Sequence, residues 1–211
     1  MSAGGTKAAQ LGALVAWLWR LGLAVLAMWA LVLMLRGPSL AKAFDTLLYF
    51  TTLTTLVVFL VNAGAVIRPV MVEGQGGRFE GSLGWFRGLA TLMAVFTGVM
   101  FATLLDGGYP DLQGKISHLV LPIAMTVDWL VIGRNQTRLP LWVPLSWAVV
   151  LTPYFWIYAW DARADGQPMY AFLDPAAADW WNWVGIVAGI AFGIGVALWL
   201  LGRLRGKLLP G

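Results

Sequence analysis

The sequence predicts an all-α membrane protein in which six transmembrane helices form a single bundle over residues 1–211. The composition gives the first two reasons. Of the 211 residues, 60% are hydrophobic and only 11% are charged, whereas an average globular domain is about 25% charged. The mean hydropathy is +0.76. The third reason is the arrangement of the apolar residues in long uninterrupted segments.

Six segments are long enough to cross a bilayer as helices, which takes roughly 20 mainly apolar residues. None of them alternates apolar and polar residues as a barrel strand does, so helices are favoured. Glycine and proline mark the connections, as in Gly37-Pro38-Ser39 after the first segment and Gly107-Gly108 after the third. The predicted spans are 11–35, 43–67, 83–105, 115–132, 141–160 and 180–201.

Lysine and arginine are distributed unequally between the two sets of loops. The side that holds both chain ends carries Lys7, Arg68, Arg78, Arg87, Arg134, Arg138, Arg203, Arg205 and Lys207, and the opposite side carries Arg36, Lys42, Lys115 and Arg163. Because cytoplasmic loops are enriched in Lys and Arg, both termini are predicted to be cytoplasmic. The formal charge of +4 therefore indicates topology and contact with membrane lipids, and no nucleic-acid partner is expected.

The chain has no Cys and a single His, which restricts its chemistry. Thiol nucleophiles, thiolate metal sites and disulfides are excluded, and a site built from several histidines is nearly excluded. Haem ligation by His118 would need a second ligand such as Met125. We therefore expect no metal and no cofactor.

Gly185, Gly189 and Gly193 form a stripe at four-residue spacing in the last span. Such a stripe allows two membrane helices to pack closely. The helix that packs against it belongs either to the same chain or to a second copy, so a homodimer through this stripe is one of two expectations.

Polar side chains inside membrane spans are costly and are therefore functional candidates. The candidates in this chain are the ionisable residues Arg20, His118 and Asp128, and the hydroxyl cluster Thr51, Thr52, Thr54 and Thr55. Thr51 is about eight residues, or roughly 12 Å, inside the second span from its outer end, and His118 is near the outer end of the fourth. The topology thus permits these two side chains to share one level in the outer leaflet.

A threonine hydroxyl paired with a histidine has a definite chemistry. The hydroxyl becomes a nucleophile when an adjacent base removes its proton, and neutral imidazole is the usual base near pH 7. Pro122 cannot donate to the carbonyl of His118, which predicts a bent helix and a free polar group beside the imidazole. Candidates for the oxyanion site or the pocket are Thr54, Thr55, Tyr154 and Tyr158. The competing interpretation is that the hydroxyls bond to backbone carbonyls and His118 lies at the interface.

Arg20 and Asp128 form a second candidate pair. Both are predicted in the inner half of the membrane, in the first and fourth spans. Burial penalises an unpaired charge far more than a paired one. A structural ion pair between the two helices is therefore favoured over a proton relay.

Three short motifs resemble a known family. Leu48-Tyr49-Phe50-Thr51 resembles the start of the second conserved helix in the androgen-induced membrane hydrolase family, also called the androgen-dependent TFPI-regulating type. The run from Ser117-His118 to Pro122 and on to Asp128-Trp129 resembles that family's histidine helix. The segment Tyr170-Ala171-Phe172-Leu173-Asp174-Pro175 resembles its Tyr-Pro-Phe-Leu-Asp loop, with Ala171 where proline is frequent.

The resemblance implies an intramembrane threonine hydrolase that cleaves fatty acid esters of hydroxy fatty acids, with Thr51 as nucleophile and His118 as its base. It requires no cofactor. The interval between these residues is shorter than in animal members, mostly through a compact loop around 68–84, which bears on substrate choice. The ten Arg against four Lys, and the abundance of Ala, Gly and Leu, indicate a bacterial member in the inner (plasma) membrane.

A transporter of small solutes or lipids is the main alternative to a threonine-type ester hydrolase. Internal repeats and buried charges are common in transporters. This sequence shows no internal repeat and has few buried charges, which counts against a transporter. A non-catalytic membrane protein is the remaining alternative, because every polar residue named above also has a structural explanation.

Overall fold

The computed structural model describes residues 7–37, 39–71, 84–105, 107–109, 111–133 and 135–208, and within these ranges the chain forms helices and turns without a strand. The long helices are α1 (Lys7–Met34), α3 (Phe50–Met71), α4 (Gly84–Leu104), α7 (Val143–Asp165) and α8 (Trp180–Leu208). A composite helix joins α5 (Leu112–Lys115), the π-helical η1 (Ile116–Val120), α6 (Leu121–Val127) and the π-helical η2 (Asp128–Ile132). Short elements are α2 (Leu40–Leu47) and the 3₁₀ turns η3 (Asn135–Arg138) and η4 (Ala171–Leu173).

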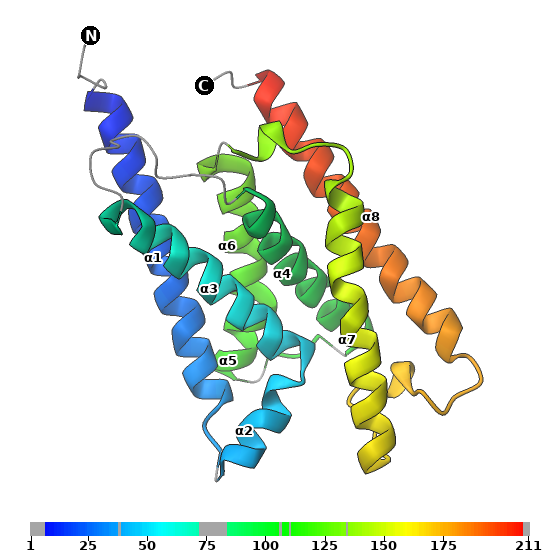
Figure 1. Cartoon of the computed structure of the whole chain (residues 1–211). Coiled ribbons are helices and arrows are strands. Elements are labelled where there is room, and N and C mark those ends of the chain that lie inside the picture. Colours follow the sequence, from blue (N-terminus) through cyan, green and yellow to red (C-terminus); the bar gives the residue numbers. More distant parts are fainter. Residues whose placement is uncertain are drawn as a thin grey trace.

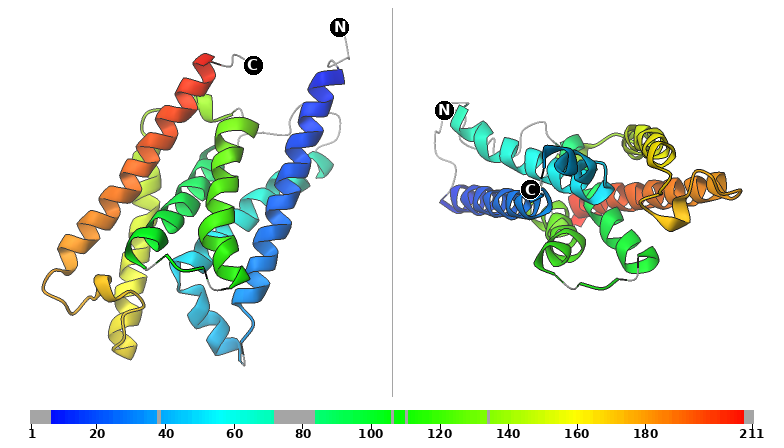
Figure 2. Two further views of the ribbon diagram at one scale, coloured as in Figure 1. Left: turned by 180° about the vertical axis from the view of Figure 1, so that it is seen from behind. Right: turned by 90° about the horizontal axis from the view of Figure 1, so that it is seen from below.

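The long helices run in alternating directions, so the start of α1 and the end of α8 lie at the same end of the bundle (Figure 1). α4 is the central helix, and 67% of the residues in its most apolar stretch are buried. On one side of it, α1 packs closely on α3 through the buried Ala27 and Ala30. On the other side, α7 packs on α8 around Trp129 and Trp147 (Figure 2).

Among the residues that the structure describes, five helical segments are long and apolar enough to cross a membrane, as the sequence predicts for an integral membrane protein. They are Leu11–Met34, Phe50–Arg68, Gly84–Leu104, Leu112–Ile132 and Trp180–Leu208. The predicted span over 141–160 corresponds to α7, which is not among the five. The reason is compositional, because its Trp, Tyr and Pro residues lower its hydropathy without shortening it.

The second predicted span, 43–67, is wrong at its start. The chain breaks between α2 and α3, and only α3 belongs to a candidate span. α2 has no buried residue and exposes Leu40 and Phe44, as an amphipathic helix in the membrane interface does. Thr51 is consequently the second residue of α3 rather than roughly 12 Å along a continuous helix.

Pro122 is accommodated by a π-helical turn. The amide of Leu121 donates to the carbonyl of Ile116, five residues back, at the end of η1. Gly98 of α4 faces this turn, and a Cβ at Gly98 would lie 3.0 Å from the carbonyl oxygen of His118. The carbonyl that the proline leaves without its helical donor therefore packs against a glycine. π-Helical turns in membrane and soluble helices are frequent at functional sites.

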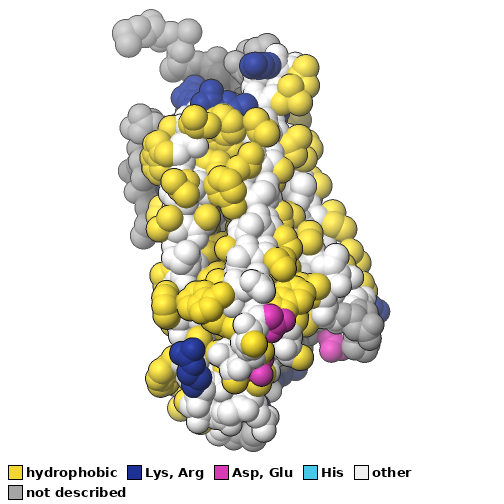
Figure 3. All heavy atoms as spheres, turned by 90° about the vertical axis from the view of Figure 1, so that its right-hand side faces the viewer, with side chains coloured by type: hydrophobic (Ala, Val, Ile, Leu, Met, Phe, Trp, Pro, Cys, Tyr) yellow, Lys and Arg dark blue, Asp and Glu magenta, His cyan; other side chains and the backbone are white. Residues whose placement is uncertain are grey.

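Figure 3 shows apolar side chains over much of one face, with a group of cations at one end, and carboxylates together with further cations toward the other. The end formed by the last turns of α8 carries Arg203, Arg205 and Lys207. Two of the cations used in the orientation count, Arg78 and Arg134, lie outside the described residues. A third, Arg87, does not belong in that count because it is buried in α4 with 4% exposure.

The glycine stripe on α8 faces away from the rest of the chain. A Cβ at Gly185, Gly189 or Gly193 would meet no other atom within 4 Å. The helix contacts its neighbours within the chain through other glycines, with Gly195 against Leu92 and Trp147. The expectation that the stripe packs against a helix of the same chain is therefore wrong. The homodimer through the stripe stays a prediction.

Candidate functional site

Thr51 and His118 meet toward the end of the bundle opposite to the two chain termini (Figure 1). The Oγ1 atom of Thr51 lies 3.2 Å from Nε2 of His118, and the hydrogen bond is partly buried. Thr51 stands in the first turn of α3, and His118 stands in the π-helical η1. Topology brings them together because both helical segments begin at the same end of the bundle (Figure 1).

The other ring nitrogen fixes the tautomer of His118. Nδ1 lies 3.1 Å from the carbonyl oxygen of Gly114, four residues back. A carbonyl can only accept a hydrogen bond, so Nδ1 of the neutral ring must carry the proton. Nε2 is then unprotonated and accepts the hydroxyl proton of Thr51. This is the arrangement that a general base requires.

A stacked ring and the cap of α5 fix the position of the imidazole. The ring of Phe101 stacks on it, with the centroids 3.8 Å apart and the planes at 13°. Asp111 caps α5 by accepting a 2.6 Å hydrogen bond from the amide of Gly114. The helix that supplies the carbonyl partner of His118 therefore begins at a defined residue.

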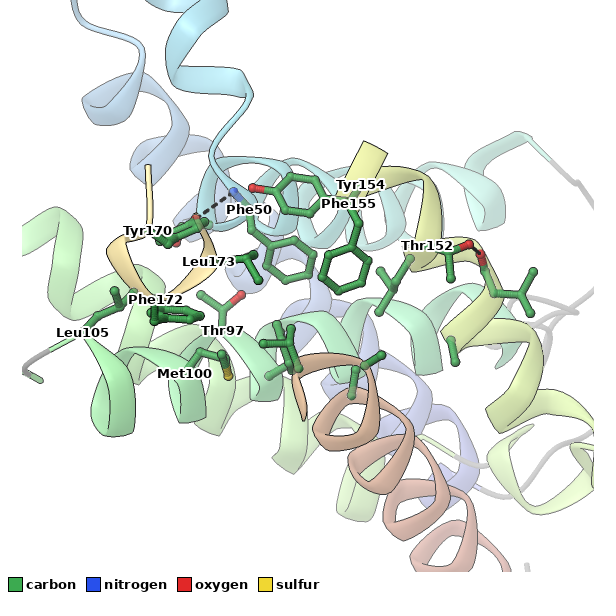
Figure 4. Close-up of a pocket in the computed structure, with 18 of the residues that line it drawn as sticks. Phe50, Thr97, Met100, Leu105, Thr152, Tyr154, Phe155, Tyr170, Phe172 and Leu173 are labelled. Atoms are coloured by element: carbon green, nitrogen blue, oxygen red, sulfur yellow. Dashed lines mark hydrogen bonds between the residues drawn. The ribbon is translucent and has the colours of Figure 1, made fainter. Parts of the chain in front are cut away.

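The first turn of α3 presents backbone amides beside the Thr51 hydroxyl. The amide of Phe50 donates to the hydroxyl oxygen of Tyr170 at 3.2 Å (Figure 4). The amides of Thr51 and Thr52 come next, and first-turn amides have no carbonyl partner within their own helix. A long helix also concentrates positive potential at this end. An oxygen that gains negative charge next to Thr51 is stabilised by both effects.

Thr51 and His118 both line a cavity of about 260 Å³. Figure 4 shows it extending from Leu105 and Phe172, past Phe50 and Phe155, to Thr152. Apart from a few hydroxyl groups and the imidazole, its lining is apolar and comes from α3, α4, α7, α8 and the η4 turn: Phe50, Thr51, Phe96, Thr97, Met100, Leu105, His118, Leu145, Ala148, Val149, Leu151, Thr152, Tyr154, Phe155, Tyr170, Phe172, Leu173, Val187, Ala188 and Ala191.

The other candidates for an oxyanion donor lie in two settings. Thr54 shares a buried 3.1 Å hydrogen bond with Thr97, and Thr55 donates to the carbonyl of Thr51 at 2.8 Å. Neither lines the cavity. Tyr154 does line it, but its hydroxyl donates to the carbonyl of Leu48 at 3.0 Å. The Thr55 and Tyr154 hydroxyls therefore support the backbone at the start of α3. The Thr54 hydroxyl is paired with Thr97 and does not belong to the cavity lining.

Tyr158 holds the segment around Tyr170, which lines one end of the cavity. It is fully buried, and its hydroxyl both donates to the carbonyl and accepts from the amide of Tyr170, each at 3.2 Å. Tyr158 is not part of the cavity lining. Its role is to fix the position of Tyr170, whose own hydroxyl receives the Phe50 amide. Burial raises the pKa of the Tyr170 phenol, so this side chain is neutral at physiological pH.

Arg20 and Asp128 lie close together but are not an isolated pair. Nε of Arg20 is 3.5 Å from Oδ1 of Asp128, and Nε of Arg87 is 3.2 Å from Oδ2 of the same carboxylate. Arg87 also donates to Oε1 of Gln136 at 2.6 Å, while the Gln136 amide donates to the carbonyl of Trp129 at 2.6 Å. This buried network joins α1, α4 and the composite helix, and none of the three charged residues lines the cavity.

Reasoning from the residues alone did not identify Gly114, Phe101 or the contact of Tyr170 with Phe50. The spacing of Gly114 and His118 was a usable signal, because a histidine ring can bond to the carbonyl four residues back in a helix. The other two contacts join segments far apart in the sequence, and no local pattern points to them.

Comparisons with protein-family models, with curated proteins and with solved structures find no match to this chain. Within the described ranges, no three His, Cys, Asp or Glu side chains are grouped so that they would hold a metal ion. The chain is thus characterised by its helical, membrane-compatible fold and by one threonine–histidine pair in an apolar cavity.

Proposed function

We propose that this protein is an intramembrane lipid ester hydrolase with Thr51 as nucleophile and His118 as general base. The single observation that supports it most strongly is the hydrogen-bonded series Thr51 Oγ1, His118 Nε2, His118 Nδ1 and the Gly114 carbonyl. A hydroxyl, a base and a group that orients the base are the three parts of a nucleophilic hydrolase site.

The proposed reaction proceeds through an acyl-enzyme. His118 Nε2 takes the proton of the Thr51 hydroxyl as Oγ1 bonds to the ester carbonyl carbon. The first-turn amides of Thr51 and Thr52 donate to the resulting oxyanion. The intermediate collapses, the ester C–O bond breaks, and the leaving alcohol takes the proton from Nε2. Water then attacks the acyl-Thr51 ester with His118 again as base, which releases the carboxylic acid and restores Thr51.

The topology that accompanies this proposal has six spans, with α7 as the sixth. α7 has 23 residues, or roughly 34 Å of helix, which is enough to cross the hydrocarbon core. The exposed Trp142 directly precedes α7, and the exposed Trp160 lies five residues before its last residue. Tryptophan favours the membrane interface at such positions. Both termini are proposed to be cytoplasmic, in a bacterial inner membrane, with Thr51 and His118 toward the outer face.

The substrate class is proposed as fatty acid esters of hydroxy fatty acids or similar lipid esters. The proposal rests on the resemblance to the androgen-induced membrane hydrolase family at Thr51, His118 and the Tyr170 loop. The apolar lining of the cavity suits such esters. The structure adds that the Tyr170 loop contributes Tyr170, Phe172 and Leu173 to that lining.

Covalent labelling with a fluorophosphonate probe in membranes tests the proposal. We expect labelling of the unmodified protein, no labelling of Thr51→Ala, and a sharp loss in His118→Ala, at equal expression. Thr91→Ala is the matched control, because Thr91 is fully buried in α4, bonds to the carbonyl of Arg87 in its own helix and does not line the cavity. Labelling that persists in Thr51→Ala would overturn the assignment of the nucleophile, and loss in Thr91→Ala would show that the losses report misfolding.

A further inference from the structure

The cavity has two arms that start from Thr51 and His118. The outer arm, toward Leu105 and Phe172, is lined by the η4 turn through Phe172 and Leu173. The inner arm follows α7 from Phe155 through Thr152 and Val149 to Leu145. Figure 4 shows Thr152 at the end of the drawn cavity opposite to Leu105 and Phe172.

The inner arm is apolar along its whole length. α7 contributes Leu145, Ala148, Val149 and Leu151, and α8 contributes the facing residues Val187, Ala188 and Ala191. The hydroxyl of Thr152 donates to the carbonyl of Val149 at 2.7 Å, so its donor is already used within α7. Three of these side chains are alanines, and their small size leaves the space between the two helices.

The inner arm also opens sideways to the surroundings of the bundle. Leu145 is 59% exposed and Val149 is 57% exposed, although both line the cavity. A side chain that is both lining and exposed marks a place where the cavity reaches the surface. At this depth of α7, in a chain that spans a membrane, the surface faces lipid tails rather than water.

The length of the arm is comparable with that of an acyl chain. Tyr154, whose hydroxyl bonds to Leu48 next to the first turn of α3, and Leu145 are nine positions apart along α7. This separation corresponds to about 13 Å of helix. A medium-length acyl chain fits between them, and a longer one extends past Val149 and Leu145 into the bilayer.

We propose that the inner arm is an acyl-chain channel, and that Val149 and Leu145 form the opening through which the chain enters from the membrane. This inference rests on the proposed function, because the acyl group is the part of the ester that stays attached to Thr51. The chain of the acyl-enzyme lies along α7, and the alcohol leaves through the outer arm near the aqueous boundary. Val149 is accordingly a residue that determines chain-length specificity.

Two neighbouring valines give a matched test. Val149 lines the channel, whereas Val150 is similarly exposed at 48% and does not line the cavity. The assay compares a butyryl and a palmitoyl ester of the same fluorescent alcohol in proteoliposomes. We expect Val149→Trp to lower the palmitoyl-to-butyryl ratio of kcat/KM about tenfold, because part of the long chain loses its place on the apolar lining. Val150→Trp should leave the ratio unchanged. An unchanged ratio in Val149→Trp, or an equal change in both variants, would overturn the channel.

A binding experiment separates this inference from the proposed reaction. Thr51→Ala is incubated with a palmitoyl ester that carries a diazirine near the middle of its acyl chain, and photolabelled peptides are identified by mass spectrometry. We expect labelling between Leu145 and Phe155, reduced in the Thr51→Ala, Val149→Trp double variant. Such labelling without any ester hydrolysis by the unmodified protein would support the channel and refute the hydrolase. Hydrolysis at Thr51 with labelling elsewhere would refute the channel alone.

Discussion

Asp128 is the residue whose removal is expected to destabilise the bundle most. The carboxylate is fully buried and lies beside two guanidinium groups, on Arg20 with 2% exposure and on Arg87 with 4%. Asp128→Asn keeps the shape of the side chain and removes its charge, so both arginines lose a charged partner inside the protein. Breaking a buried ion pair from one side costs about 3–5 kcal/mol. This is a large part of the roughly 5–15 kcal/mol that keeps a domain folded.

The measurement is a double-mutant cycle on the free energy of unfolding. Unfolding is followed by Trp fluorescence as SDS is titrated into mixed micelles, since the chain has 13 Trp. Arg20→Met with Asp128→Asn should lose less than the sum of the single losses, by about 0.5–3 kcal/mol. The double variant should not recover fully, because Arg87 still lacks the carboxylate. Asp45→Asn makes the same chemical change at an exposed position of α2 and should cost less than about 0.5 kcal/mol. Strictly additive losses would refute the pairing of Arg20 with Asp128.

Two other substitutions test packing and the support of the site. A Cβ at Gly88 would overlap the buried ring of Trp147 and lie 3.0 Å from Trp129, so Gly88→Ala should lower the unfolding free energy by about 1–3 kcal/mol. Gly64→Ala, which meets nothing within 4 Å, should raise it by up to about 1 kcal/mol, and equal effects of the two changes would contradict the packing. Tyr170→Phe removes the acceptor for the first amide of α3 and should lower kcat of ester hydrolysis about tenfold with less than about 1.5 kcal/mol lost in unfolding. A rate equal to that of the unmodified protein would show that Tyr170 does not position Thr51.

The proximity of Thr51 and His118 was accessible from the sequence because it depends on topology. Both residues lie near the starts of helices that begin at the same end of the bundle, and the hydropathy pattern indicates at which end each helix begins. The break between α2 and α3 was not accessible in this way. The Leu48 carbonyl is bonded by a side chain 106 residues away, and the Phe50 amide by one 120 residues away. Both contacts exist only after the bundle has formed.

Arg87 illustrates the opposite error. Its place near the start of the third predicted span made it look like a loop cation that sets orientation. In the structure it is buried, because Asp128 of the composite helix and Gln136 of the η3 turn supply its partners. A charge count treats every Arg near a helix end alike and has no information on which carboxylate the fold brings to it.

The Gly114 carbonyl orients His118 without a charged group, and this affects where in a membrane a histidine site can be built. Many hydrolases orient their histidine with a carboxylate, and a carboxylate at membrane depth must be stripped of water at a high cost. Here a backbone dipole from the preceding helical turn selects the same tautomer without adding a charge. The chain therefore assembles a base and its orienting group from neutral parts, and no counter-ion has to accompany them into the bilayer.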